Sequence, residues 1–107
     1  NKNLMKQYLS PEQTAKLIEL GFMEPIGSWE TSDNVYSIGE LMAMIPPSYS
    51  DRWRGDFYLT IKHDSVFWFV GYIVSGARKP HIILSDTELI DALYDMILEL
   101  KKEEIIL

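Results

Sequence analysis

The middle of the chain contains the stretch Ser65-Val66-Phe67-Trp68-Phe69-Val70-Gly71-Tyr72-Ile73-Val74. Apolar side chains occupy both odd and even positions of this stretch. Successive side chains of a β-strand point to opposite faces of the sheet, so a strand here presents an apolar surface on both sides. The stretch therefore predicts a central strand, and it raises the question of what covers each face.

The neighbouring segments predict that this strand lies in an antiparallel sheet. Residues 57–61 alternate between two sets of side chains, as in a half-buried strand, and only residues 63–65 separate them from the central strand. A second turn at residues 75–80 leads to another apolar run at residues 81–84. We expect a three-stranded antiparallel meander.

The expected pairing of the first two strands divides their side chains between two faces. One face should carry Phe57, Leu59, Ile61, Val66, Trp68, Val70 and Tyr72. The other should carry Tyr58, Thr60, Lys62, Phe67, Phe69 and Ile73. The last helix offers an apolar stripe for the first face, at Leu89, Leu93, Ile97 and Leu100. The second face could be covered by the N-terminal half of the chain, by a second copy of the chain or by a ligand.

Three capping boxes predict the helices. They are Ser10-Pro11-Glu12-Gln13, Ser37-Ile38-Gly39-Glu40 and Ser85-Asp86-Thr87-Glu88. We expect helices over residues 11–20, 38–45 and 86–103, the first closed by Gly21 and the second by Pro46-Pro47.

The remaining segments complete a single α+β domain over residues 1–107. Apolar residues flank a polar run between Phe22 and Tyr36, which predicts a short N-terminal hairpin. Residues 46–55 have the composition of a loop, and we expect fraying of residues 1–8 and 104–107.

Three segments carry a resemblance to a known group of proteins. They are Pro11 to Pro25, Tyr36 to Pro46 (Tyr-Ser-Ile-Gly-Glu-Leu-Met-Ala-Met-Ile-Pro) and Glu88 to Ile97. Together they resemble small proteins of no assigned function that are encoded on bacterial prophages and other mobile elements. The resemblance covers about a third of the chain. It implies a genomic context and brings no activity and no functional residues with it.

The amino-acid composition argues against several classes of function. The chain has no cysteine, which removes disulfide and thiolate chemistry and fits a reducing cytoplasm. No apolar run approaches the ~20 residues that span a bilayer. The net charge is -6, although residues 50–85 carry five Lys or Arg and three acids. The overall charge argues against non-specific binding to nucleic acid and leaves room for a local basic patch.

The sequence contains no complete catalytic or metal-binding motif. His63 and His81 are expected at opposite ends of the sheet, too far apart to share a metal ion. Gly71 to Arg78 has the glycine spacing of a phosphate-binding loop, but it lacks the required Lys and Ser/Thr and precedes a strand. An acidic stripe on the last helix has the spacing of a solvated face, with docking or divalent-ion binding as the alternative, at Asp91, Asp95, Glu99 and Glu103.

Two segments have the residue types of binding surfaces. Tyr58, Phe67 and Phe69 share the second sheet face, where aromatic rings could stack on single-stranded bases or, alternatively, could be buried as core. Trp and Arg dominate interface hot spots, so the sequence Arg52-Trp53-Arg54 predicts a partner contact. The alternative is that Trp53 folds back on the core.

We therefore expect a small, non-enzymatic protein-binding or accessory protein of the cytoplasm, without a cofactor. Its partner would be another protein or a second copy of the chain. The candidate partner-binding residues are Arg52, Trp53, Arg54, Tyr58, Phe67 and Phe69. The alternative function is a nucleic-acid-binding module that uses the basic, aromatic edge of the sheet.

Overall fold

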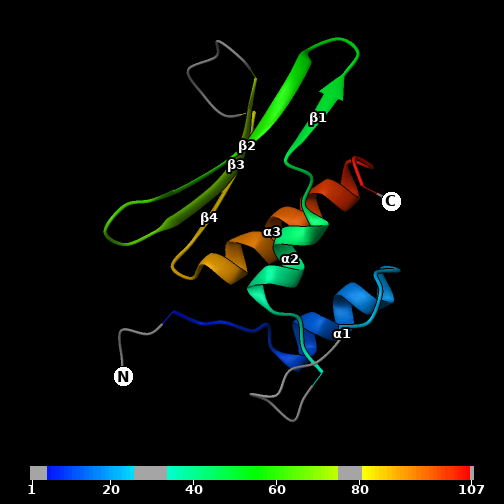
Figure 1. Cartoon of the computed structure of the whole chain (residues 1–107), viewed down its shortest axis with the longest axis vertical. Coiled ribbons are helices and arrows are strands. Elements are labelled where there is room, and N and C mark those ends of the chain that lie inside the picture. The colour runs from blue at the N-terminus through cyan, green and yellow to red at the C-terminus, as the bar shows by residue number, and fades with distance from the viewer. Residues whose placement is uncertain (1–4, 26–33, 75–80, 107) are drawn as a thin grey trace.

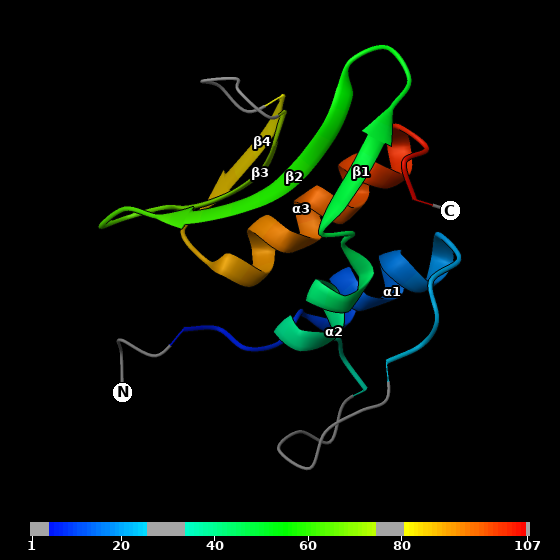
Figure 2. The same cartoon turned by 45° about the horizontal axis from the view of Figure 1, so that its top comes forward.

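A computed structural model describes residues 5–25, 34–74 and 81–106. Its elements in chain order are α1 (Pro11–Glu19), α2 (Ile38–Met44), β1 (Ser48–Asp51), β2 (Gly55–His63), β3 (Trp68–Val74), β4 (Ile82–Asp86) and α3 (Leu89–Lys102). The strands form one antiparallel sheet in the order β1-β2-β3-β4. In Figures 1 and 2, α3 lies against this sheet and α2 and α1 lie beyond α3, on the same side. The α+β class is confirmed.

The first two helices begin where their capping boxes predict. The Ser10 hydroxyl accepts from the Gln13 backbone N–H at 3.1 Å, and the Ser10 N–H donates to the Gln13 side chain at 3.0 Å. Ser37 and Glu40 form the same reciprocal pair at the start of α2. Gly21 follows α1 with φ +102°, a left-handed conformation that glycine adopts without strain.

The third capping box does not form. Strand β4 continues to Asp86, so Ser85 is held in the sheet and cannot cap a helix. Helix α3 begins at Leu89, three residues later than expected, and Glu88 at its N-cap makes no side-chain capping bond. The Asp86 carboxylate accepts instead from the Glu88 backbone N–H at 3.1 Å and closes the turn between β4 and α3.

The segment predicted as a loop contains a strand. Within residues 46–55, β1 pairs with β2 through Tyr49 and Phe57, so the sheet has four strands and not the expected three. The Tyr49 ring stacks on Phe57 with centroids 5.0 Å apart and meets Tyr72 edge-on at 4.9 Å. The half-buried ring of Tyr49 thus helps to hold an otherwise polar four-residue strand, Ser-Tyr-Ser-Asp, at the sheet edge.

The predicted N-terminal hairpin lies largely outside the described residues, since its centre falls in residues 26–33. The flanking residues 22–25 and 34–36, which are described, contain no strand. Just after this segment, an antiparallel bridge pairs Ser37 with Tyr8. The Tyr36 hydroxyl donates to the Met23 carbonyl, which ties the end of this segment to its beginning.

The predicted division of the two sheet faces is confirmed by the strand register. Leu59 pairs with Tyr72 and Ile61 with Val70 on the face toward α3, whereas Tyr58 pairs with Ile73 on the opposite face. The exception is Val66, which lies in the turn between β2 and β3 and is 54% exposed. The Asp64 carboxylate shapes this turn by accepting from two backbone N–H groups, those of Val66 and Phe67, each at 2.7 Å.

Helix α3 is the centre of the core. Its fully buried side chains are Ile90, Ala92, Leu93, Met96, Ile97 and Leu100. They occupy more than one side of the helix, because α3 packs against the sheet and also against α2. The expected cover for Val70 and Tyr72 is therefore in place, and the Tyr72 hydroxyl donates to the Pro46 carbonyl at 2.5 Å.

We predict that Gly71→Ala destabilises the protein. A Cβ at this position of β3 would lie 2.6 Å from the Ile82 carbonyl oxygen, so neighbouring backbone must shift. Overpacking of this kind costs about 1–3 kcal/mol. Urea denaturation measures the loss. Gly39→Ala is the matched control, since its Cβ meets nothing closer than the Ser37 hydroxyl at 3.9 Å, and a stability equal to wild type at Gly71→Ala would contradict the prediction.

Candidate functional site

One face of the sheet is not covered by any described residue of the chain. We call it the open sheet face and define it by Ser48, Ser50, Asp56, Tyr58, Thr60, Lys62, Phe69, Gly71, Ile73, Ile83 and Ser85. The helices lie on the other side of the sheet (Figure 2). Tyr58, on the inner strand β2, is 47% exposed, and Ile83, on the edge strand β4, is 49% exposed. The interpretation of this face as buried core is therefore wrong for the described residues.

The aromatic residues predicted as partner-binding lie on or beside this face. Tyr58 is on β2 and Phe69 is on β3, opposite Lys62. Phe67 precedes β3, is 43% exposed and lies with its ring centroid 6.4 Å from that of Phe69. The prediction from sequence missed Ile83. In β4, Ile82 and Leu84 pack against the core. Because side chains alternate along a strand, Ile83 between them must point to the opposite face, and this alternation could have identified it from sequence.

Arg52, Trp53 and Arg54 form the turn between β1 and β2, at the opposite end of β2 from Phe67. Trp53 is 87% exposed, so it does not fold back on the core. The Arg52 guanidinium lies 5.6 Å from the centroid of the Trp53 ring. The Asp51 carboxylate shapes the turn by accepting from the backbone N–H groups of Trp53 at 2.8 Å and Arg54 at 3.2 Å. These bonds, that to Trp53 above all, hold the pKa of Asp51 below its usual range.

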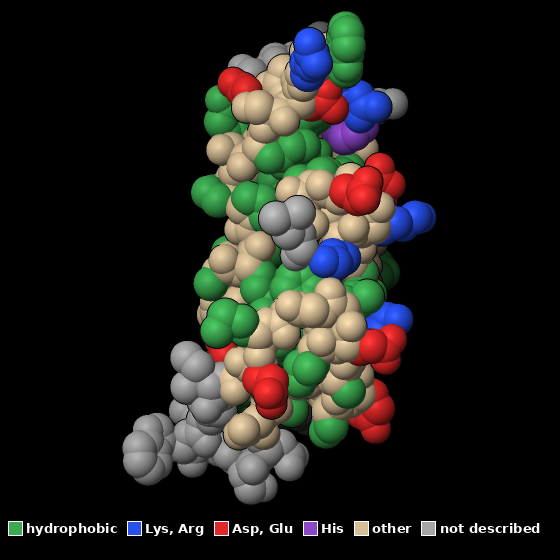
Figure 3. Space-filling view, turned by 90° about the vertical axis from the view of Figure 1, so that its right-hand side faces the viewer, with side chains coloured by type: hydrophobic (Ala, Val, Ile, Leu, Met, Phe, Trp, Pro, Cys, Tyr) green, Lys and Arg blue, Asp and Glu red, His purple; other side chains and the backbone are tan. Residues whose placement is uncertain are grey.

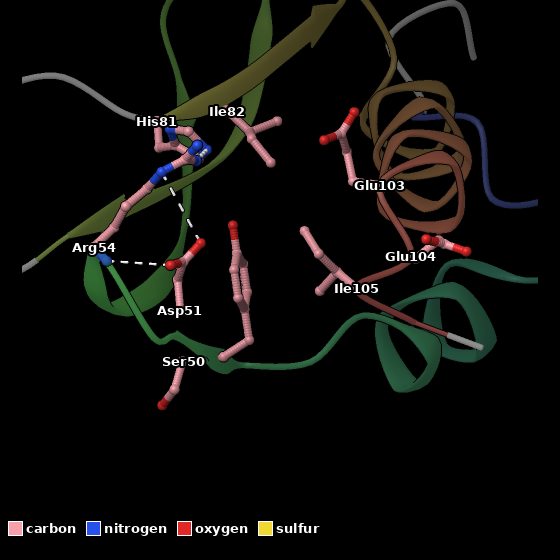
Figure 4. Close-up of a pocket in the computed structure, with 9 residues that line it drawn as sticks. Ser50, Asp51, Arg54, His81, Ile82, Glu103, Glu104 and Ile105 are labelled. Atoms are coloured by element: carbon pink, nitrogen blue, oxygen red, sulfur yellow. Dashed lines mark hydrogen bonds and ion pairs between the residues drawn. The ribbon is translucent and has the colours of Figure 1, made fainter.

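A polar pocket of about 370 Å³ lies beside this turn. Figure 4 shows side chains from three places around it, and Figure 3 shows charged groups and a histidine gathered at this end of the molecule. The lining residues are Tyr49, Ser50, Asp51, Arg54, His81, Ile82, Glu103, Glu104 and Ile105. Glu104 has φ 59°, and this left-handed turn after α3 allows the Ile105 N–H to donate to the Leu100 carbonyl at 2.9 Å.

Arg54, His81 and Asp51 lie on one wall of the pocket, and Glu103 and Glu104 lie on the other. Arg54 Nη1 lies 2.6 Å from His81 Nε2, and Arg54 Nε lies 4.0 Å from an Asp51 carboxylate oxygen. An arginine can only donate, so Nε2 of His81 must accept and cannot act as a base while this contact holds. Burial and then the charge of Asp51 raise the pKa of the Tyr49 hydroxyl, which keeps it protonated.

The residues considered for metal binding are not brought together. His63 stacks on Trp68 with centroids 4.2 Å apart, whereas the His81 N–H donates to the Tyr72 carbonyl near the other end of β3. At about 3.3 Å per residue along a strand and 4.8 Å between strands, His63 and His81 are roughly 20 Å apart. Among residues 5–25, 34–74 and 81–106, no three His, Asp or Glu side chains are grouped to hold a metal ion.

The acidic stripe on α3 is partly used in holding the fold together. Asp91 forms an ion pair with Lys6 at 3.0 Å and accepts from the Gln13 side chain at 3.0 Å. These contacts fasten the N-terminal segment and α1 to α3. Burial, followed by the charges of Asp86 and Asp91, raises the pKa of Asp95.

The predicted basic edge of the sheet is described only in part. Arg78 and Lys79 lie outside the described residues, as does the second turn with its phosphate-loop-like glycine spacing. Within the described part, none of the helices has the length and hydropathy needed to cross a membrane. Comparison of the chain with models of protein families, with curated proteins and with solved structures finds no match.

We predict that Asp95→Asn stabilises the protein at neutral pH. Because the pKa of Asp95 is raised on folding, the folded state favours the protonated carboxyl, and the ionised form reduces stability once the pH exceeds both pKa values. The gain should be absent at about pH 2, where the carboxyl is protonated in both states. Thermal denaturation at the two pH values measures it, with Glu99→Gln as a control on the same helix. An equal gain at both pH values would contradict the assignment.

We predict that Trp53→Ala leaves stability unchanged within about 0.5 kcal/mol, because the ring is exposed and packs on no core residue. Urea denaturation tests this. Arg54→Ala removes the contacts to His81 and Asp51 and serves as the comparison in the same turn. A loss of more than about 1 kcal/mol for Trp53→Ala would show that the ring packs on the protein.

Proposed function

We propose that this chain is a small, non-enzymatic protein-binding domain that acts through its open sheet face. The observation that carries the proposal is the exposure of Tyr58, Phe67 and Ile83 on or beside one sheet face while the helices pack on the other. Large contiguous apolar patches on a protein surface mark interaction sites. Aromatic side chains supply a large part of the binding energy where proteins meet.

The composition of the open sheet face favours a protein over a nucleic acid as the partner. Its charged side chains are Lys62 and Asp56, one of each sign, and the chain as a whole carries a net charge of -6. A strand of nucleic acid gains most of its affinity from cations that neutralise its phosphates. A face with a balanced charge and an apolar centre matches a protein surface of the same character.

Nucleic-acid binding is the second candidate function. Exposed rings at Tyr58 and Phe67, with Lys62 nearby, could stack single-stranded bases. Binding of this kind is salt-dependent, so it differs in its measured behaviour from apolar protein contact.

The proposed setting is an accessory role in the cytoplasm of a bacterium that carries the mobile element. The absence of cysteine is consistent with a reducing compartment. The resemblance of residues 11–25, 36–46 and 88–97 to small prophage-encoded proteins supports the genomic context.

The function is tested by capture of partners from a bacterial lysate with wild-type protein and with Tyr58→Ser and Ile83→Ser. Both side chains are about half exposed, so the variants should fold. Loss of a hot-spot side chain costs about 2 kcal/mol, which reduces recovery of a specific partner roughly thirtyfold. Ile18→Ser, on the exposed side of α1 at 38% exposure, is the control and should recover the same partners as wild type.

Partners retained equally by the two face variants would refute the proposed surface. Binding of a single-stranded oligonucleotide that weakens with salt and with Lys62→Ala would replace the first function with the second.

A further inference from the structure

The strand register divides the open sheet face into rows that run across the strands. One row holds Tyr58 and Ile73. The next row toward His63 holds Thr60, Gly71 and Ile83, and the one after that holds Lys62, Phe69 and Ser85. On the other side of Tyr58, Asp56 pairs with Ser50 of β1. The face therefore alternates along β2 from an acid to a large ring, then to a small side chain, then to a base.

This order is self-complementary under a two-fold rotation. Consider a second copy laid face to face on the first, with the two-fold axis between the sheets, perpendicular to the strands and level with the Leu59–Tyr72 pair. The two β2 strands then run antiparallel, one above the other. Lys62 of each copy faces Asp56 of the other, and Tyr58 of each faces Thr60 of the other. A two-fold interface requires this kind of reciprocal match.

The charges match in this arrangement. Asp56 and Lys62 are both exposed and lie six residues apart on one strand, symmetrically about Leu59. The interface would contain two Lys62–Asp56 pairs, one at each end. One carboxylate oxygen of Asp56 accepts from the Ser50 hydroxyl at 2.7 Å, which orients the carboxylate.

The sizes of the side chains match as well on β2 and β3. Tyr58 and Ile73 are large, whereas Thr60 and Gly71 in the next row are small. In the face-to-face arrangement Tyr58 and Ile73 of each copy lie over Thr60 and Gly71 of the other. Interdigitation of side chains from the two facing sheets is how stacked sheets pack about 10 Å apart.

We propose that a second copy of this chain covers the open sheet face, in a symmetric dimer of stacked sheets. The inference rests on the proposed function, since it names the protein that the face binds. In this arrangement β2 lies over β2 along its length and residues 70–74 of β3 lie over the same residues of the second copy, whereas β1 and almost all of β4 extend beyond the overlap. At about 3.3 Å per residue and 4.8 Å between strands, the overlap measures on the order of 200 Å² in projection. Such an area is below that of standard specific interfaces, so the dimer should be weak, with a dissociation constant between about 10 µM and 1 mM.

The experiment is sedimentation analysis of the wild-type chain from about 1 µM to about 1 mM, which brackets that range of dissociation constants. The expected result is a shift from monomer to dimer. Lys62→Glu and Asp56→Lys each place like charges opposite each other and should weaken the dimer about tenfold or more. The double variant Lys62→Glu with Asp56→Lys exchanges the two charges and should restore dimerisation toward wild type. Lys102→Glu changes the charge equally at the exposed end of α3 and should dimerise as wild type does.

Two outcomes would overturn the inference: a wild-type chain that remains monomeric over the whole range, or a double variant no tighter than the single ones. The same samples separate this failure from failure of the proposed function. A monomeric wild type that still captures a host protein, lost in Tyr58→Ser, overturns the dimer and keeps the binding face. A monomer whose captured proteins do not depend on the face overturns both.

Discussion

Burial of α3 between the sheet and α2 is the constraint on which the rest of this structure depends. The helix has apolar side chains on more than one side, and Leu93, Met96 and Ile97 are all fully buried. A helix of this kind requires cover on both sides, and here the sheet supplies one and the N-terminal helical segments supply the other. Because α2 is drawn to the far side of α3, it is not available to the second face of the sheet.

The open sheet face is therefore a consequence of where the helices pack: α2 covers α3 and cannot also cover the second face of the sheet. The helices α1, α2 and α3 all lie on one side of the sheet (Figure 1). Tyr58 and Ile83 remain about half exposed on the other side. The same strand register that places them there also spaces Asp56 and Lys62 evenly about Leu59. Both proposals made for this protein come from that one surface.

The pocket beside the β1–β2 turn depends on a different contact. Its position requires β1, which is held to the sheet by the ring of Tyr49 against Phe57 and Tyr72. Its charged wall requires Asp51 to accept from the backbone of the turn and so direct Arg54 toward His81. Neither could be predicted from sequence, because a polar four-residue strand has no periodic signal and His81, which contacts Arg54, comes from a distant segment.

The amino-acid sequence by itself determined the α+β class, two capped helices and the division of β2 and β3 into two faces. These features are local: a capping box needs four residues, and alternation needs one strand. The tertiary structure alone decided which face is covered, where β4 ends and α3 begins, and that residues 48–51 join the sheet. Those outcomes depend on competition between segments for the same buried surface. Tyr58 and Phe69 could thus be assigned to a face from their spacing, but their exposure followed only from where α1 and α2 packed.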